Sequence, residues 1–209
     1  FKFHKENEEY YTGIESIADA CLVVPSKSML HESGKEFRGI YRILTESHIL
    51  FDLMQDEVLS APSAADKLKK YKTVILPDIK DMSPAALRNI ESYVNEGGNI
   101  LATGKTSAYD AHGNLLDKVM LACAGIKEIC KIIPQEKGMY LRVRPCDKNV
   151  LKGFEDLDII YLYDDFMVLD TDDDSEKYLS YIPTCMFGPP EKCYYSLETT
   201  IPGMVLKQY

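Results

Sequence analysis

The residues best suited to chemistry gather in one short polar segment, Thr103 to Asp110, which reads Thr-Gly-Lys-Thr-Ser-Ala-Tyr-Asp. The segment begins where the apolar run Asn99 to Thr103 ends. That run predicts a strand, and open α/β sheets bind ligands at the carboxyl ends of their strands. The sequence therefore predicts a binding turn, and Gly104 is expected there because glycine permits a close approach or a positive φ. The candidate ligand-binding residues are Asp78, Gly104, Thr106, Ser107, Tyr109 and Asp110.

A polar turn that only joins a strand to a loop is the alternative. The segment is neither a Gly-x-Ser-x-Gly nucleophile turn nor a phosphate-binding loop. A covalent mechanism would also need a base beside the nucleophile, usually histidine. The four histidines are His4, His31, His48 and His112, and each reads as a solvated side chain in a polar context. We therefore predict no catalytic residue.

Metal chemistry finds no clear pattern either. Asp170, Asp172 and Asp174 have the spacing of a calcium loop, but Ser175 stands where glycine is needed and Tyr181 where the bidentate glutamate is needed. The cysteines contain no Cys-x-x-Cys pair and no zinc-like spacing, so we expect free thiols. They are Cys21, Cys123, Cys130, Cys146, Cys185 and Cys193. We predict neither a metal nor a cofactor.

Composition limits the partners. The formal net charge of -9 disfavours nucleic acid, whose binding draws on clustered Lys and Arg. No apolar run reaches the roughly 18 residues of a membrane span, so no membrane partner is expected. No targeting signal is visible, which leaves a cytoplasmic or a periplasmic location open. There is no tryptophan to stack on a sugar, although 14 tyrosines could do so, and a carbohydrate ligand stays open.

The elements that must position the polar turn alternate between strand and helix. Apolar runs and helical spacing predict strands at Ala20–Val24, 49–53, 73–76 and Asn99–Thr103, with helices at 36–48, 63–70, 83–96 and 115–124. Ser83 and Pro84 are a helix start, and Gly97 with Gly98 is a helix end. Strands that alternate with helices predict an α/β fold with a doubly wound, mostly parallel sheet.

The chain changes character after about residue 135. Short strand-like pieces separated by Pro, Gly and Asp follow at 139–143, 159–163, 166–169, 178–182 and 205–208. We therefore divide the chain into an α/β domain, residues 1–135, and a β-rich extension, residues 136–209, packed on the same domain.

Four segments resemble the β-galactosidase trimerisation-domain family: Tyr71–Asp78, Met82–Ser83, Tyr93–Gly98 and Thr103–Asp110. The resemblance covers roughly the first 130 residues, and its most specific part is the Thr-Gly-x-Thr-Ser-x-Tyr-Asp segment. The strand that ends at Pro77 and the helix end at Gly97 and Gly98 are weaker features, because trehalose-utilisation-type domains share them. The region 140–209 is similar to the continuation found in predicted glycoside hydrolases that carry this domain after a catalytic barrel.

The resemblance implies a flavodoxin-like fold similar to that of class I glutamine amidotransferases. Alignment of the turns places Thr106 near the nucleophile position of those enzymes. No cysteine lies between Cys21 and Cys123, and no histidine follows His112. The implied role is a non-catalytic accessory or oligomerisation domain, with the catalytic barrel of a glycoside hydrolase and further copies of the chain as partners. The alternatives are a sugar-binding or small-molecule-binding domain, or an amidotransferase-like hydrolase, that uses the turn after the fourth strand.

Self-association of the isolated chain is expected to be weak. No long apolar stripe stands out in the sequence, and a net charge of -9 opposes the close approach of identical chains.

Overall fold

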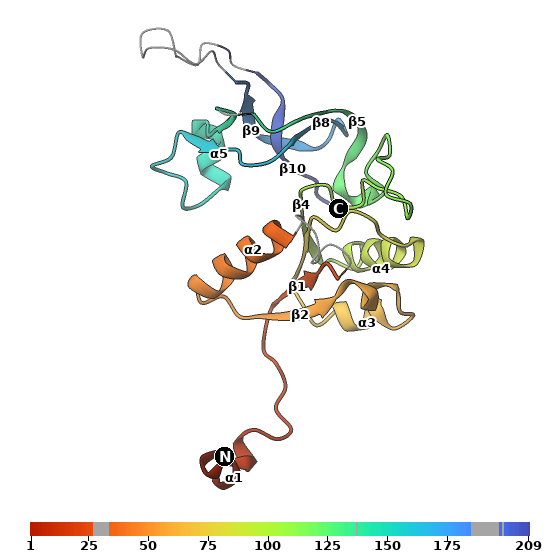
Figure 1. The fold of residues 1–209 in the computed structure, drawn as a ribbon, viewed down its shortest axis with the longest axis vertical. Coiled ribbons are helices and arrows are strands. Elements are labelled where there is room, and N and C mark those ends of the chain that lie inside the picture. The colour runs from red at the N-terminus through yellow and green to blue at the C-terminus, as the bar shows by residue number, and fades with distance from the viewer. Residues whose placement is uncertain (27–33, 137, 185–196, 198) are drawn as a thin grey trace.

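The structure is a computed structural model that describes residues 1–26, 34–136, 138–184, 197 and 199–209. Figure 1 shows an α/β half, a β-rich half beside it, and an N-terminal arm that extends away from both. The arm contains α1 (Lys2–Glu6) and η1 (Glu8–Tyr10), which bury no residue. The arm therefore takes no part in either core.

The α/β half is built from four strands and the helices between them. In chain order these are β1 (Ala20–Val24), α2 (Gly34–Glu46), β2 (Phe51–Gln55), η2 (Asp56–Ser60), α3 (Ala64–Leu68), β3 (Thr73–Pro77), α4 (Pro84–Asn95) and β4 (Asn99–Thr103). All pairs are parallel, in the order β2-β1-β3-β4. The predicted α/β class, the parallel sheet and all four of its strands are confirmed.

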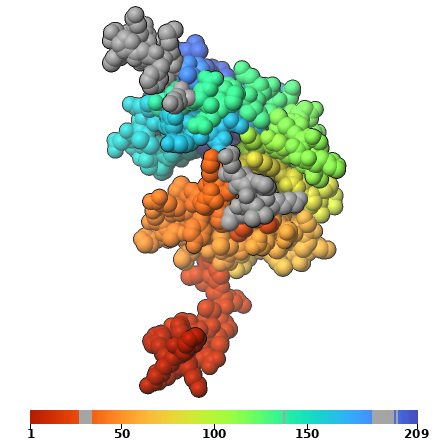
Figure 2. Space-filling view, in the orientation of Figure 1, coloured from red at the N-terminus to blue at the C-terminus, as the bar shows by residue number. Residues whose placement is uncertain are grey.

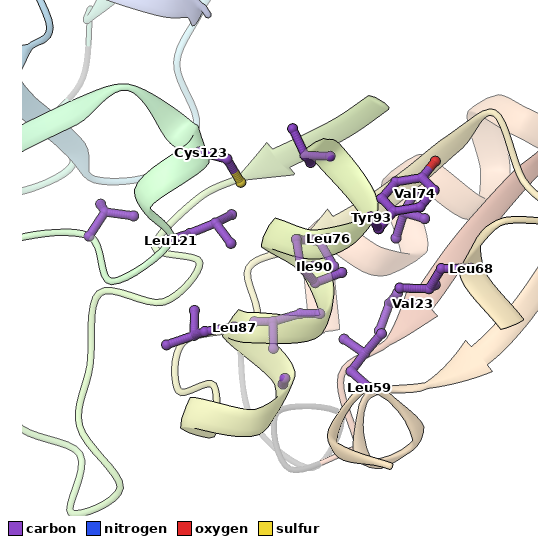
Figure 3. Packing of buried hydrophobic residues seen from close by; sticks show 14 of the residues in the cluster. Val23, Leu59, Leu68, Val74, Leu76, Leu87, Ile90, Tyr93, Leu121 and Cys123 are labelled. Atoms are coloured by element: carbon purple, nitrogen blue, oxygen red, sulfur yellow. The ribbon is translucent and has the colours of Figure 1, made fainter. Parts of the chain in front are cut away.

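The larger core lies on the face of this sheet that α3, η2 and α4 cover (Figure 3). Val23, Val74 and Leu76 of the strands face Leu87 and Ile90 of α4. Burying each such aliphatic side chain contributes roughly 1.5–3 kcal/mol. This face is therefore the main source of stability in the α/β half.

A buried tyrosine ties the end of α4 to the sheet. The Tyr93 hydroxyl donates to the Tyr71 carbonyl oxygen at 3.0 Å. A Cβ at Gly98 would lie 2.2 Å from the Tyr93 ring, and Gly97 has a φ of 96°. The Gly-Gly helix end thus serves both the left-handed stop and the close approach of the ring.

In the part of the chain that the structure describes, α2 is the only helix that covers the opposite face of the sheet. Phe37 and Leu44 of α2 pack on Leu22 and Ile75 in a smaller core. The neighbours of Leu22 and Ile75 in the outer strands are Leu53 and Leu101, which are 52% and 46% exposed. One helix therefore leaves the edges of this face open to solvent.

The β-rich half contains η3 (Ala122–Ala124), β5 (Ile126–Ile133), β6 (Tyr140–Arg142), α5 (Pro145–Val150), β7 (Ile159–Tyr161), β8 (Phe166–Thr171), β9 (Glu176–Ile182) and β10 (Pro202–Leu206). One antiparallel sheet has the order β10-β9-β6-β7, and β5 pairs with β8. Met139, Leu141 and Phe166 lie in its core, where Phe166 stacks on Tyr181 at 4.4 Å between centroids. β5 and β8 also contact the α/β core through Ile129 and Met167, which joins the two halves.

The helix predicted at 115–124 is wrong. Val119, Leu121 and Cys123 are buried while the residues between them are exposed, which is the period of an extended chain. Only the 3-10 turn η3 forms there. The helical interpretation failed because Met120 and Leu121 donate their backbone N–H groups to Ser107, a contact that spacing cannot reveal.

Two elements of the β-rich half, β5 and α5, are also absent from the sequence prediction. β5 was missed because register shifts at Ile126/Glu128 and Ile129/Lys131 interrupt its period-two pattern. α5 was missed because its six residues are too short for a periodic stripe. Its start depends on Asp147, which is fully buried and accepts from the Arg144 backbone N–H at 2.7 Å.

Loss of the α4 cap is expected to lower stability. The Ser83 hydroxyl oxygen accepts from the Ala86 backbone N–H at 3.1 Å. Ser83→Ala removes this acceptor and should cost about 1 kcal/mol of unfolding free energy, whereas Ser83→Asp should retain most of it. Urea denaturation of the three proteins measures the effect. Equal losses for Ala and Asp would show that the cap hydrogen bond is not the cause.

Candidate functional site

The candidate site lies where β3 and β4 end. Asp78 follows β3 and Gly104 follows β4, and both have left-handed backbones, with φ of 48° and 58°. The strand order reverses direction between β1 and β3, and such switch points are where open α/β sheets bind ligands. Asp78 is thus a non-glycine residue in a strained backbone conformation, and such conformations cluster at functional sites.

Asp78 is the buried carboxylate of the site. One carboxylate oxygen accepts from the Lys105 backbone N–H at 2.8 Å, and the other lies 4.0 Å from the Lys80 ammonium. Burial raises the pKa of Asp78 above its ordinary value, and the Lys105 amide and the Lys80 charge offset only part of that effect. Asp78 is thus a desolvated acid held between two loops.

Gly104 is required by its contact with Asp78. A Cβ on Gly104 would lie 2.7 Å from the Asp78 carboxylate oxygen Oδ1. Its backbone is also left-handed. Both reasons expected from the sequence, a close approach and a positive φ, are confirmed.

Thr106 is directed into the protein. Its hydroxyl lies 2.8 Å from the Thr103 carbonyl oxygen and 3.0 Å from that of Leu76, and it accepts from the Ile79 N–H at 3.1 Å. The side chain is buried. All of these partners are backbone groups, so the hydroxyl joins the end of β3 to the turn after β4.

Ser107 has the same structural character. It has a φ of 53° and is buried, and its hydroxyl oxygen accepts from the Leu121 N–H at 3.1 Å. Its backbone N–H donates to the Ile79 carbonyl and its carbonyl accepts from the Met120 N–H. Ser107 therefore holds the extended segment before η3 against the turn.

Tyr109 and Asp110 lie farther out. The Lys80 ammonium lies 5.9 Å from the centre of the Tyr109 ring. Asp110 accepts from the backbone N–H groups of His112 and Asn114, at 2.9 and 2.8 Å. The hydrogen bonds from Asn114 lower the pKa of Asp110. The Asp110 carboxylate thus organises its own loop.

The structure adds charged residues that the sequence did not indicate. Glu36 of α2 accepts from the Thr103 hydroxyl at 3.0 Å, and Lys105 forms a 2.6 Å ion pair with Asp165 of the β-rich half. The Lys105 hydrogen bond lowers the pKa of Asp165. These partners are separated by 67 and 60 residues in the chain, so no local spacing could have revealed them.

No catalytic pair or metal site is assembled by the residues that the structure describes. His4, His48 and His112 are exposed, and His31 lies outside the described residues. No group of three or more His, Cys, Asp or Glu side chains able to hold a metal occurs among the residues described. Cys21, Cys123, Cys130 and Cys146 are free thiols, whereas Cys185 and Cys193 lie outside the described part of the chain.

Two of the aspartates that have the spacing of a calcium loop form ion pairs within the chain. Asp172 and Asp174 both pair with Lys207. Burial raises the pKa of Cys21 to about 12 and that of Cys123 to about 11, which disfavours the reactive thiolate form. Within the described segments, no helix is both long and apolar enough to cross a membrane.

The parallel sheet and its switch-point turn define a flavodoxin-like α/β domain extended by antiparallel strands. The chain belongs to the β-galactosidase trimerisation domain family, whose model matches residues 26–139, more than half of the chain. A search of curated proteins finds no match.

Solved structures share the fold at low sequence identity. An α-L-fucosidase, isoenzyme 2 from Paenibacillus thiaminolyticus, has a TM-score of 0.64 and 23% identity over 99% of this chain and 30% of its own. A GH42 β-galactosidase from G. stearothermophilus has a TM-score of 0.62 and 15% identity over 92% of this chain and 26% of its own. A ThuA-like protein from Bacteroides uniformis has a TM-score of 0.55 and 14% identity over 79% of this chain and 68% of its own. The chain thus spans less than a third of the length of the two glycosidases.

Gly104→Ala is expected to destabilise the fold more than Gly113→Ala. Both glycines have positive φ, which costs an L-residue about 1–2 kcal/mol, but a Cβ at Gly113 meets nothing within 4 Å. The difference between the two variants in urea denaturation isolates the clash with Asp78. Equal losses would show that the contact with Asp78 does not constrain Gly104.

Asp78→Asn is expected to stabilise the protein at neutral pH. A raised pKa in the folded state means that wild-type stability falls as the pH rises from the ordinary aspartate value through the raised value. Asparagine keeps an acceptor for the Lys105 N–H and does not ionise. The stability difference between variant and wild type, from urea denaturation between pH 4 and 8, should therefore grow with pH.

Asp110→Asn is the matched control with the opposite sign. The pKa of Asp110 is lowered in the folded state, so its stabilising effect is present at neutral pH and is lost as the pH falls. The variant should be less stable than wild type at pH 7 and similar to it in acid. The same pH trend for both variants would contradict the assigned electrostatics.

Proposed function

We propose that this chain is a non-catalytic accessory and assembly domain of a glycoside hydrolase. The proposal rests on the turn after β4. Its two hydroxyls, those of Thr106 and Ser107, are buried and bonded to backbone groups. A nucleophile must instead be exposed to its substrate and lie within reach of a base.

Family membership supports the assembly half of the proposal. The family is described as a trimerisation domain of β-galactosidases. Two of the structural relatives are much longer glycosidases, of which the matched part is 30% or less. A catalytic barrel and further copies of the chain are therefore the proposed partners.

A ligand-binding role is the second candidate, and one observation favours it. Asp78 is a buried acid with a left-handed backbone at the switch point of the sheet. A carboxylate there could accept from a sugar hydroxyl or another small neutral donor, with Tyr109 and Asp110 at the rim. In this role Gly104, Thr106 and Ser107 would hold the turn in place, and Asp78 would contact the ligand.

The non-catalytic role predicts no turnover by the 209-residue chain. Nitrophenyl galactosides and fucosides, and glutamine, should all be left intact in assays sensitive to slow hydrolysis. Thr106→Val should unfold at lower urea because it leaves the Ile79 N–H without its acceptor, at a cost of about 1–3 kcal/mol. Hydrolysis that Thr106→Val or Ser107→Ala abolished in a still folded protein would overturn the proposal.

A further inference from the structure

Two surfaces of the chain have complementary composition. The first, the α2 face, consists of the outer side of α2 and the sheet residues on either side of it. Lys35, Arg38 and Arg42 form a basic ridge at i, i+3 and i+7 along α2, and Arg42 also pairs with Glu46 of the same helix at 2.7 Å. The apolar residues Leu53 and Leu101 are about half exposed on the sheet beside it. The α2 face is therefore apolar with a basic ridge.

Further apolar side chains extend this face on both sides of α2. Tyr41 is exposed and meets the Phe51 ring edge-to-face at 5.4 Å, which places it on the β2 side. Ile43 is 61% exposed and lies seven residues after Glu36, which bonds to Thr103 of β4, so it lies on the β4 side. Exposed apolar side chains on both sides of a helix are a feature of interaction sites.

The second surface, the β7 segment, consists of residues 153–165. It contains five acidic residues and no Lys or Arg, although Asp158 pairs with Lys148 and Asp165 with Lys105. Four of its apolar residues are exposed, and Tyr163 is 81% exposed. Among the described residues β7 is an edge strand of its sheet, with β6 as its one neighbouring strand. The exposed apolar residues of the segment are Leu157, Ile159, Tyr161 and Tyr163.

The elements that carry the two surfaces both lie toward the left of the view in Figure 2. Figure 2 shows α2, in orange, directly below the cyan region of the chain that includes α5 and the residues after it. In a closed ring of three copies, each subunit contacts its two neighbours through two different surfaces, and both of these surfaces face the rotation axis. Contact between like surfaces would bring basic ridge to basic ridge or acid to acid, which is unfavourable.

We propose that the α2 face of one copy binds the β7 segment of the next copy, so that the chains form a closed ring. This inference rests on the proposed assembly function and names its partner, a second copy of this chain. Contacts between two different surfaces close into rings when the rotation permits. The family description as a trimerisation domain gives three as the number of copies. The segregated charge also removes the objection that a net charge of -9 opposes association.

The test is sedimentation velocity on the complete protein that contains this chain. Lys35→Glu with Arg42→Glu alters the α2 face, and Asp156→Lys with Asp158→Lys alters the β7 segment. Each pair should weaken trimer formation about tenfold or more, and the protein with all four changes should recover most of it. Lys118→Glu, an exposed change on neither surface, is the control and should sediment as wild type.

Mixing the two altered proteins tests the pairing directly. The unaltered β7 segment of one protein binds the unaltered α2 face of the other, and the two altered surfaces also have opposite charge, so the mixture should form alternating oligomers. A ring of three cannot alternate, so one of its contacts would join like charges and a closed trimer should not form. Thermal melting of each variant checks that it is folded.

Two results would overturn different claims. A wild-type trimer that neither pair of changes weakens would disprove the location of the interface and retain the assembly function. A monomeric wild-type protein would remove both.

Discussion

The hydrogen bonds between the end of β3 and the turn after β4 hold the α/β half to everything that follows it. The Thr106 hydroxyl, in this turn, bonds to the Leu76 carbonyl and the Ile79 N–H at the end of β3. The Asp78 carboxylate, which follows β3, accepts from the Lys105 N–H in the turn. Ser107 then binds the segment that leads into β5. Because these groups are buried, leaving any one unpaired costs about 1–3 kcal/mol. A turn that has this structural task has little freedom to reorganise around a substrate.

Much of the α/β half could be predicted because its signals are local. Ser83 and Pro84 start α4 and Gly97 ends it, and the cap hydrogen bond to Ala86 and the left-handed stop both lie within the helix and its ends. The segment 115–124 was misread because its apolar residues fit a helix as well as an extended chain, and its contacts with Ser107 decide between them. Periodicity describes a segment by itself and cannot include a partner from another part of the chain.

Only some features of the candidate site could be predicted from the sequence. Its position at the carboxyl ends of the strands follows from the alternation of strands and helices, and Gly104 could be singled out by its residue type. The direction in which each hydroxyl points could not be predicted. Thr106 and Ser107 have the residue types of a binding turn, yet the structure turns both inward to backbone groups. The pairing of Thr103 with Glu36 and of Lys105 with Asp165 could not be predicted, because long-range folding brings these residues together.

The uneven covering of the parallel sheet makes the link from fold to assembly. A doubly wound sheet needs both faces covered, because its central strands are apolar on each side. Here α4, α3 and η2 cover one face, and in the described part of the chain α2 is the only helix on the other, so Leu53 and Leu101 stay half exposed at its edges. In the proposed assembly, a second copy would cover these residues with its β7 segment, residues 153–165, which carries exposed apolar side chains and acidic residues.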